Sequence, residues 1–407
     1  MNKFPRSAYV HIPFCHRRCF YCDFAVIPLG NKVETLQGYG SKTVKEYLNF
    51  LYKEILSINC KSPLSTIYIG GGTPSILDPQ QIKELIDLFK ENFGVDYGAE
   101  ITMEVDPASF SEDDLYGFIN AGINRFSLGV QSFNNHILQN SGRRHSGEEA
   151  EKSCLWLKKV YSFGLIKSWS LDLIQNLPLS GFKEWQEDLK KTIKFLPPHI
   201  SIYDLNIENG TVFKKLSNLG KLQIPSDEEA FRNSESTYYI LKSSGYSRYE
   251  ISNYSLPRHQ SRHNRVYWSG LGWWSFGQGS TSSPWGEKLT RPRVSKEYKE
   301  WVTRQNELNL DSSLVNKNFV YQELDEKIML GLRLKEGIDI HKFLKEQNWD
   351  KKKYDYNLKK LLEEWKIFFE SGLLVREGNR FFLSDPRGME LSNQILIAMF
   401  KWWDDIN

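Results

Sequence analysis

The sequence predicts an α/β fold: a partial (β/α)6 barrel of the TIM type, followed by a C-terminal winged-helix-like α+β domain. Short apolar runs alternate with longer helical patterns along residues 1–210. This alternation is typical of parallel strands joined by right-handed crossovers. Polar residues and glycines follow the apolar runs, at the strand ends where barrels gather their chemistry. From about residue 295 the pattern changes to helices and one pair of short strands.

Six strands are expected in the barrel segment, which is assigned to residues 1–210. They cover residues 7–12, 66–69, 100–104, 125–129, 169–174 and 200–207. Apolar residues at helical spacing fill the intervals, at residues 43–58, 79–93, 111–121, 147–161 and 183–195. Periodicity alone does not separate an open barrel from a flat doubly wound sheet, and the barrel is the interpretation that fits better.

Residues 211–294 are expected to extend the barrel. A helix is predicted at residues 227–244, and an irregular stretch rich in Tyr, Trp, Gly, Ser and Asn follows it. The aromatic content of this stretch is too high for a solvated linker. It is therefore expected to form functional or capping loops.

Residues 295–407 are assigned to the winged-helix-like domain. Glu377, Gly378 and Asn379 join its two strands, and Gly and Asn tolerate the positive φ of a hairpin turn. Such domains often bind DNA, but this hairpin is not strongly basic and a fold does not fix function. Strands are expected at residues 373–376 and 380–383, and helices at residues 323–334, 340–346, 353–371 and 388–403.

The composition is that of an ordinary globular protein, with 40% hydrophobic and 25% charged residues. A net charge of +3 is too small to indicate a nucleic-acid partner. No apolar run approaches the roughly 18 residues of a membrane span. No secretion signal precedes the first strand, so the cytoplasm is the expected compartment. A peripheral membrane contact through Phe400, Trp402 and Trp403 is left open.

Three of the five cysteines, Cys15, Cys19 and Cys22, lie within eight residues just after the first expected strand. Such clustering indicates metal or redox chemistry rather than a disulfide framework. Three thiolates in one loop can hold three corners of a [4Fe-4S] cubane and leave the fourth iron open. The alternative is a zinc site completed by His11 or His16, but zinc sites usually combine two ligand pairs, and no second cysteine pair exists.

The segments Tyr9-Val-His-Ile-Pro-Phe-Cys15 and Tyr21-Cys22-Asp23-Phe24, with this cysteine spacing, resemble the radical S-adenosylmethionine (SAM) superfamily. More narrowly, they are similar to its oxygen-independent coproporphyrinogen III oxidase-like branch. The resemblance implies that SAM binds the open iron through its amino and carboxylate groups. It also implies that the reduced cluster can pass one electron to the sulfonium and break a carbon–sulfur bond.

The resemblance further assigns SAM-binding roles to residues at the ends of successive strands. Gly71, Gly72 and Thr73 belong to the segment that would meet the methionine amino group, and Glu104 would bond the ribose hydroxyls. Without the resemblance these are ordinary turn glycines and a solvated carboxylate. The remaining members of the implied SAM site are Tyr9, Tyr21, Gln131, Arg143, Asp172 and Asn206.

Two interpretations within this branch are open: an enzyme and a delivery protein. The enzyme is coproporphyrinogen III oxidase, and the delivery proteins are the HemW-like heme chaperones. The oxidase has a further cysteine where this chain has Phe24, and it has a longer arm before its cluster motif. The stretch from Arg333 to Asp339 also resembles the chaperones. A chaperone is therefore expected and oxidase activity is not, while turnover of SAM is left open.

His263, Asn264, Tyr267 and Trp268 match the HNxxYW motif that is associated with heme binding in HemW-like proteins. Neutral imidazole is a common axial ligand of heme iron, and the two aromatic rings offer flat apolar surface. The alternative is a packed loop whose histidine is hydrogen-bonded. The resemblance thus implies heme, heme-accepting proteins and an electron donor for the cluster as partners.

Two positions depart from the family pattern. Asn176 stands where glycine is usual, and Ser280 stands where alanine is usual after the HNxxYW motif. Asparagine is the commonest residue other than glycine at positive φ, so the turn at Asn176 is expected to form.

Overall fold

The computed structural model describes residues 4–30, 42–58, 60–307 and 323–406 of the chain. All six expected strands form, and they lie in one curved sheet in the order of the sequence. Each is parallel to its neighbour, so the predicted α/β class with a barrel-type parallel sheet is confirmed. The strands are β1 (Ser7–Ile12), β4 (Leu64–Gly71), β5 (Val95–Val105), β6 (Arg125–Gln131), β7 (Ser168–Gln175) and β8 (His199–Asp204).

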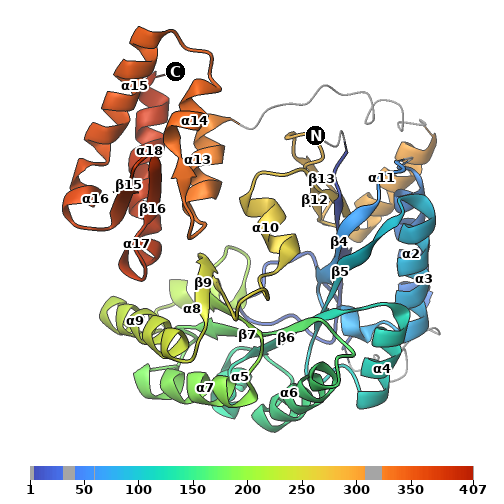
Figure 1. Cartoon of the computed structure of the whole chain (residues 1–407). Coiled ribbons are helices and arrows are strands. Elements are labelled where there is room, and N and C mark those ends of the chain that lie inside the picture. Colours follow the sequence, from blue (N-terminus) through green and yellow to red (C-terminus); the bar gives the residue numbers. More distant parts are fainter. Residues whose placement is uncertain (1–3, 31–41, 59, 308–322, 407) are drawn as a thin grey trace.

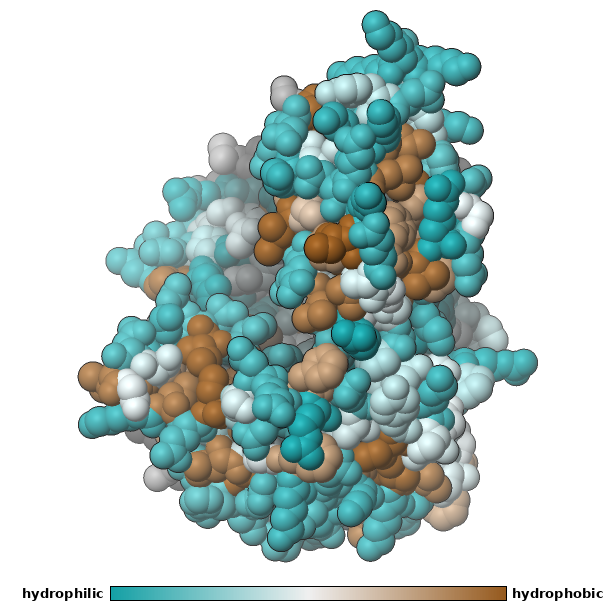
Figure 2. All heavy atoms as spheres, turned by 90° about the vertical axis from the view of Figure 1, so that its left-hand side faces the viewer, coloured by the Kyte–Doolittle hydropathy of each residue, from teal (hydrophilic) through white to brown (hydrophobic). Residues whose placement is uncertain are grey.

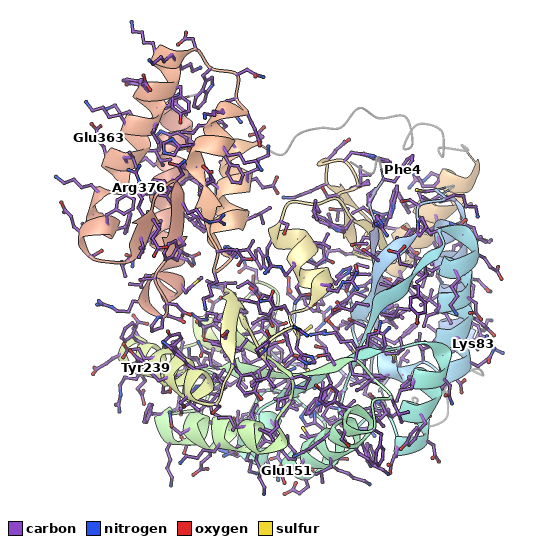
Figure 3. The ribbon with its side chains drawn as sticks, viewed as in Figure 1. Phe4, Lys83, Glu151, Tyr239, Glu363 and Arg376 are labelled. Carbon is purple, nitrogen blue, oxygen red and sulfur yellow. The ribbon has the colours of Figure 1, made fainter. Side chains whose placement is uncertain are left out.

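The five predicted helices of this segment cover the outer face of the curved sheet (Figure 1). Asp78, Ser111 and Ser146 begin three of them as capping boxes, in which the cap and the third helical residue bond each other's backbone. Lys83 and Glu151 on the outer helices point away from the sheet (Figure 3). The helices are α2 (Lys42–Leu56), α3 (Pro79–Asn92), α4 (Glu112–Ala121), α6 (Gly147–Ser162) and α7 (Phe182–Phe195).

The two faces of the sheet differ sharply in polarity. Phe126, Leu128 and Val130 alternate along β6 with Arg125 and Ser127, as side chains of a strand must point to opposite faces. The apolar set is fully buried in the core beneath the helices. Hydrogen bonds among polar side chains of neighbouring strands show that they share the inner face: Tyr68 with Glu104, Ser127 and Ser170 with Asp172, and Ser170 with His199 and Ser201.

The segment after β8 adds strands to both edges of the sheet, although an irregular stretch was expected there. On one edge β10 (Asn253–Ser255) pairs with β8 and then with β9 (Ser247–Glu250), both antiparallel. On the other edge β11 (Trp274–Phe276) pairs parallel with β1. Runs of three or four residues are too short to show a periodicity, which is why the sequence did not reveal them.

Several further short elements were not predicted. The HNxxYW motif forms helix α10 (Arg262–Trp268), which lies on the inner side of the curved sheet (Figure 1). The predicted helix α9 (Asp227–Ser243) is present. The other short elements are β2 (Phe14–Cys15), β3 (Ile27–Pro28), η3 (Pro74–Ile76), α5 (Asn135–Asn140), α8 (Val212–Asn218), β12 (Thr281–Ser282) and β13 (Leu289–Thr290).

Helix α11 (Ser295–Glu307) belongs to the barrel body by its packing. Its Tyr298 and Val302 are fully buried in the barrel core, and Tyr298 donates a hydrogen bond of 2.7 Å to Glu54 of α2. The predicted boundary at residue 295 therefore precedes helix α11, whereas the residues that build the separate C-terminal core begin after that helix.

The C-terminal part has a separate core built around Trp365, Phe381 and Trp402. The expected hairpin forms, and β14 adds a third antiparallel strand. The helix predicted at residues 353–371 is divided at Trp365, and the last helix is divided at Leu391. The elements are α13 (Leu324–Leu332), β14 (Ile338–Asp339), α14 (Ile340–Lys345), α15 (Lys351–Glu364), α16 (Lys366–Glu370), β15 (Leu374–Glu377), β16 (Arg380–Leu383), α17 (Arg387–Glu390) and α18 (Ser392–Ile406).

The surface of this region corrects one expectation. Trp402 is only 1% exposed and its indole N–H donates to the carbonyl of Asn357, so it is a core residue and not a membrane contact. On the face shown in Figure 2, apolar side chains are interspersed with hydrophilic ones. None of the described helices is long and apolar enough to cross a bilayer.

A buried cluster around Glu54 ties the added strand β11 to helix α2. Glu54 is 3% exposed; it pairs with Arg291 at 2.8 Å and accepts a hydrogen bond of 2.8 Å from the backbone of Gly277, just after β11. Removing one member of a buried pair leaves the other charge uncompensated.

We therefore expect Glu54→Gln to lower the free energy of unfolding by about 3–5 kcal/mol. Urea unfolding followed by tryptophan fluorescence measures this. The matched control is Glu46→Gln on the same helix, because Glu46 pairs with Lys299 in solvent and should change the midpoint little. Equal midpoints for both variants would contradict the structural role of Glu54.

Candidate functional site

The three clustered cysteines lie at the mouth of a cavity of about 360 Å³, at the carboxyl ends of the parallel strands. Most of the residues predicted for the cluster and SAM therefore meet in one place. The lining includes eleven of them: Cys15, Cys19, Cys22, Tyr21, Gly71, Gly72, Thr73, Glu104, Gln131, Arg143 and Asp172.

The cysteine loop is held in place by segments distant in sequence. The backbone N–H of Phe20 donates to Ser141 at 3.0 Å, and the N–H of Phe213 donates to the carbonyl of Phe20 at 3.0 Å. The Phe20 ring packs against the Phe213 ring at 6.3 Å between centroids. A Cβ at Gly142 would lie 2.7 Å from the Phe20 ring, so this position needs glycine. Helices α5 and α8, neither of them predicted, thus fix the position of the loop.

Each cysteine sulfur has a hydrogen-bond donor beside it. The Thr73 hydroxyl lies 3.7 Å from the Cys15 sulfur, and Nη1 of Arg143 lies 3.5 Å from the Cys19 sulfur. The backbone of Phe24 forms a hydrogen bond with the Cys22 sulfur. Burial raises the pKa of Cys15 to about 12 despite the Thr73 contact, and burial also raises the pKa of Cys22. Ligation by these thiols would therefore release protons.

The cysteine loop packs closely against Gly72, just after β4. A Cβ at Gly72 would lie 2.6 Å from the Phe14 carbonyl and 2.9 Å from the Cys15 sulfur, so only glycine allows this close approach. Among the described residues, no three Cys, His, Asp or Glu side chains converge on a single metal ion. Thiolates that each bind a different iron of a cubane need no such common point. The donors are therefore compatible with a cluster.

Glu104 occupies the centre of the cavity wall. Its carboxylate accepts hydrogen bonds from the Tyr68 hydroxyl at 2.9 Å and from the backbone N–H of Gly71 at 3.0 Å. Burial raises the pKa of Glu104 to about 7, although both hydrogen bonds oppose this change. Asp172 is similarly buried and accepts from Ser127 and Ser170, both at 2.6 Å.

Arg143 bridges the cavity wall and the cysteine loop. Its guanidinium pairs with Asp106, donates to the Gly129 carbonyl at 2.8 Å and contacts Cys19. Burial acts to raise the pKa of Asp106, but the Arg143 charge, His145 and the backbone N–H of Ala108 together outweigh it, and the pKa lies below its ordinary value. Asp106 is thus ionised beside the site, a role that sequence reasoning missed although the residue is part of the Glu-Val-Asp-Pro stretch.

Gln131 lines the cavity and has a buried polar atom that a bound ligand could contact. It has a φ of 66°, at the end of β6, and its Oε1 is buried without a hydrogen-bond partner among the described residues. An unpaired buried acceptor is unfavourable until a ligand or water satisfies it. Ser127 and Tyr203 also line the cavity and were not predicted, since a serine and a tyrosine within strands carry no distinctive signal.

Two predicted SAM residues lie outside this lining. The Tyr9 hydroxyl bonds His11 at 3.2 Å, and its ring stacks on Tyr68 deeper in the barrel. Asn206 is exposed beyond the end of β8. The expectation for Asn176 is confirmed, because it has a φ of 64° and forms the turn that glycine usually makes.

The HNxxYW motif lies at the opposite end of the barrel from the cysteines. His263 is 1% exposed, and its ring nitrogens bond the Thr66 hydroxyl at the start of β4 and the Tyr267 hydroxyl, both at 2.8 Å. Burial lowers the pKa of His263 to about 3. Glu100 at the same end accepts from the backbone N–H groups of Arg262 and His263. Trp268 lies against Arg333 of the C-terminal region.

Comparison with known proteins connects this geometry to a family. The family model of the radical SAM superfamily matches residues 9–171. A heme chaperone HemW of Synechocystis sp. is 36% identical over 97% of this chain and 96% of its own length. A heme chaperone HemW of Lactococcus lactis is 31% identical over 99% of both chains.

A solved structure shares the whole fold. Coproporphyrinogen III oxidase (HemN) from Escherichia coli, a radical SAM enzyme, superimposes with a TM-score of 0.77 at 22% identity, covering 97% of this chain and 90% of its own. Radical SAM proteins use a [4Fe-4S] cluster and SAM, which agrees with three cysteines around one cavity. With a relative this similar along nearly the whole of both chains, the protein belongs to the HemW family of the radical SAM superfamily.

Proposed function

We propose that this protein binds heme, holds a [4Fe-4S] cluster that is ligated by SAM, and delivers heme to acceptor proteins. The observation that carries the proposal is the full-length similarity to proteins named heme chaperone HemW. The cavity supports it, because it brings three cysteines together with carboxylate, amide and guanidinium groups suited to an amino-acid nucleoside.

Cys15, Cys19 and Cys22 would hold the cluster, and SAM would occupy the cavity beside them. A cluster and SAM together supply reductive cleavage of a carbon–sulfur bond. Around them, Gln131 offers an unpaired amide oxygen and Arg143 offers a cation for a carboxylate. The remaining proposed contacts are Tyr9, Tyr21, Gly71, Gly72, Thr73, Glu104, Asp172 and Asn206.

The alternative function is oxidative decarboxylation of coproporphyrinogen III, and the cavity disfavours it at one position. Phe24 stands where the oxidase has a further cysteine; it lines the cavity mouth and is 56% exposed. An apolar ring at the mouth suits a flat apolar ligand and supplies no thiol chemistry. Incubation with coproporphyrinogen III, SAM and a reductant under anaerobic conditions tests this alternative, and decarboxylated product would overturn the chaperone assignment.

The partners follow from the proposed roles. Heme transfer needs a heme-accepting protein, and reduction of the cluster needs an electron donor. We place the protein in the cytoplasm, because Cys15, Cys19 and Cys22 are thiols and a reducing compartment keeps thiols available for a cluster.

Heme ligation by His263 requires a change in helix α10. Both ring nitrogens of His263 are hydrogen-bonded, to Thr66 and Tyr267, so neither has a lone pair available to iron in this state. We propose that His263, with Asn264, Tyr267 and Trp268, meets heme after Tyr267 has released the Nε2 atom.

The cluster ligands give the first test. Anaerobic reconstitution should load about four iron and four sulfide per chain, and Cys19→Ser should abolish this loading. Iron and sulfide analysis with the 400-nm absorbance measures it. Cys60→Ser is the matched control, since Cys60 is buried in the hydrophobic core, away from the cavity. Unchanged loading in Cys19→Ser, or zinc in place of iron, would end the cluster proposal.

The Asp106–Arg143 pair beside Cys19 gives a second test. Asp106→Asn removes a negative charge next to the cluster site and should raise the midpoint reduction potential, whereas Arg143→Gln should lower it. Potentiometric titration monitored by electron paramagnetic resonance, without SAM, measures both. Asp188→Asn is the control, because that buried carboxylate bonds Ser132 and Phe133 outside the cavity. Shifts of equal sign in the two variants would contradict the argument.

Heme titration gives a third test. His263→Ala should weaken hemin binding about tenfold or more if the imidazole is an axial ligand. Tyr267→Phe should bind hemin at least as tightly as the wild type, because it removes the hydroxyl that occupies Nε2. Absorbance titrations compare the three proteins after circular dichroism has verified their folding. Equal affinity in all three would remove His263 from the ligands, and no binding in the wild type would remove the chaperone proposal.

A further inference from the structure

A buried arginine lies one inward-facing position below the floor of the cavity. Arg125 begins β6 and is 2% exposed. Ser127, two residues on, lines the cavity, so Arg125 lies about 6–7 Å deeper along the strand. Its neighbours in register are Thr102 on β5 and Ser168 on β7. The side chain therefore belongs to the polar interior of the barrel.

Arg125 has no counter-charge in contact with it. It forms no ion pair and no side-chain hydrogen bond within the described part of the chain, and its Nε is buried without a partner. The hydroxyl of Thr102, beside it in register, is also buried and unpaired. A guanidinium stays charged in a protein, and a buried charge is costly unless it is paired.

The carboxylates of the barrel interior are already engaged by other donors. None of them lies within ion-pair distance of Arg125, and both oxygens of each accept a hydrogen bond elsewhere. The donors are Ser127 and Ser170 to Asp172, Tyr68 and Gly71 to Glu104, Arg262 and His263 to Glu100, and Ser252 and Asn253 to Glu250.

The histidines near Arg125 are neutral. Burial lowers the pKa values of His199, His259 and His263, and the charge of Arg125 lowers them further. These side chains are therefore neutral near pH 7. Burial raises the pKa of Asp172 and the charge of Arg125 acts to lower it, but the two groups form no ion pair, so the guanidinium can still take an anion in direct contact.

We propose that Arg125, with the Thr102 hydroxyl, binds the carboxylate group of a ligand inside the barrel. The planar guanidinium offers two parallel N–H donors, which match a carboxylate better than they match a water molecule. The carboxylate has two candidate sources, a free small acid or an acidic side arm of a larger ligand. The second source rests on the proposed function, because heme carries two propionate groups.

Propionate and its neutral isostere propionamide provide the first experiment. At equal ionic strength, propionate should raise the thermal midpoint of the wild-type protein and propionamide should not. In Arg125→Gln, propionate and propionamide should have the same effect on the thermal midpoint. Without ligand, the thermal midpoint of this variant should be no lower than that of the wild type, since the substitution removes an uncompensated buried charge. Arg125→Lys retains the positive charge but lacks the two parallel N–H donors of the guanidinium. It should keep only part of the difference between propionate and propionamide, and it replaces the glutamine variant in this test if that variant does not fold.

The matched control is Arg248→Gln. Arg248 is also buried, at 7% exposed, but it pairs with Asp385 at 3.2 Å and with Glu390 at 2.7 Å. This variant should be less stable than the wild type and should retain the response to propionate. An equal response of wild type to propionate and propionamide, or an unchanged propionate response in Arg125→Gln, would overturn the proposal.

Hemin and hemin dimethyl ester identify the source of the carboxylate. If a propionate arm occupies the site, Arg125→Gln should weaken hemin binding about tenfold and leave ester binding unchanged. If Arg125→Gln removes the response to propionate and hemin affinity is unchanged, the site takes free small acids. Absence of hemin binding in every protein, with the propionate response intact, would refute the heme proposal and leave the Arg125 site standing.

Discussion

The structure depends on one constraint, which is that the inner face of the barrel is polar and must nevertheless be buried. Barrels of this type usually fill their interior with branched apolar side chains. Here the inward positions carry hydroxyl, carboxyl, imidazole and guanidinium groups, and each needs a hydrogen-bond partner. The serines of β6, β7 and β8 meet this need by bridging Asp172 and His199. Where the bridging stops, at Gln131 and Arg125, the fold leaves a place for a ligand.

The cysteine loop is only partly buried, yet it is held in one place. The loop lies at the open end of the barrel, so strand pairing alone cannot fix it. Phe20 inserts between Gly142 and Phe213, and Arg143 joins the loop to Asp106 at the end of β5. Three parts of the chain outside the loop thus hold it in position. A ligand that needs rigid thiolates gains from this, because little conformational freedom remains to be lost on binding.

Sequence reasoning succeeded where a signal repeats over many residues. The six strands and five outer helices are long enough to show their period. The family resemblance assigned Gly71, Glu104, Gln131 and Asp172 to one site, and parallel strands bring their ends together, so these residues line one cavity. It failed where the information lies in a contact between distant segments. A seven-residue helix such as α10 shows no period, and nothing in the local sequence indicates that Asp106 pairs with Arg143. Asn206 stands after β8, where a strand-end residue can equally face solvent.

The HNxxYW motif and the cavity are joined through strand β4. Thr66 of β4 bonds His263 of the HNxxYW motif, and Tyr68, two residues on, bonds Glu104 in the cavity. The Tyr68 and His263 rings lie 5.2 Å apart between centroids. Side chains at i and i+2 share one face of a strand, so both contacts are made on the inner side of the barrel. If α10 moves to free His263, Tyr68 loses a packing partner on one side and keeps its hydrogen bond to Glu104 on the other. Under the proposed function, heme at the motif and a ligand in the cavity would therefore act on the same tyrosine.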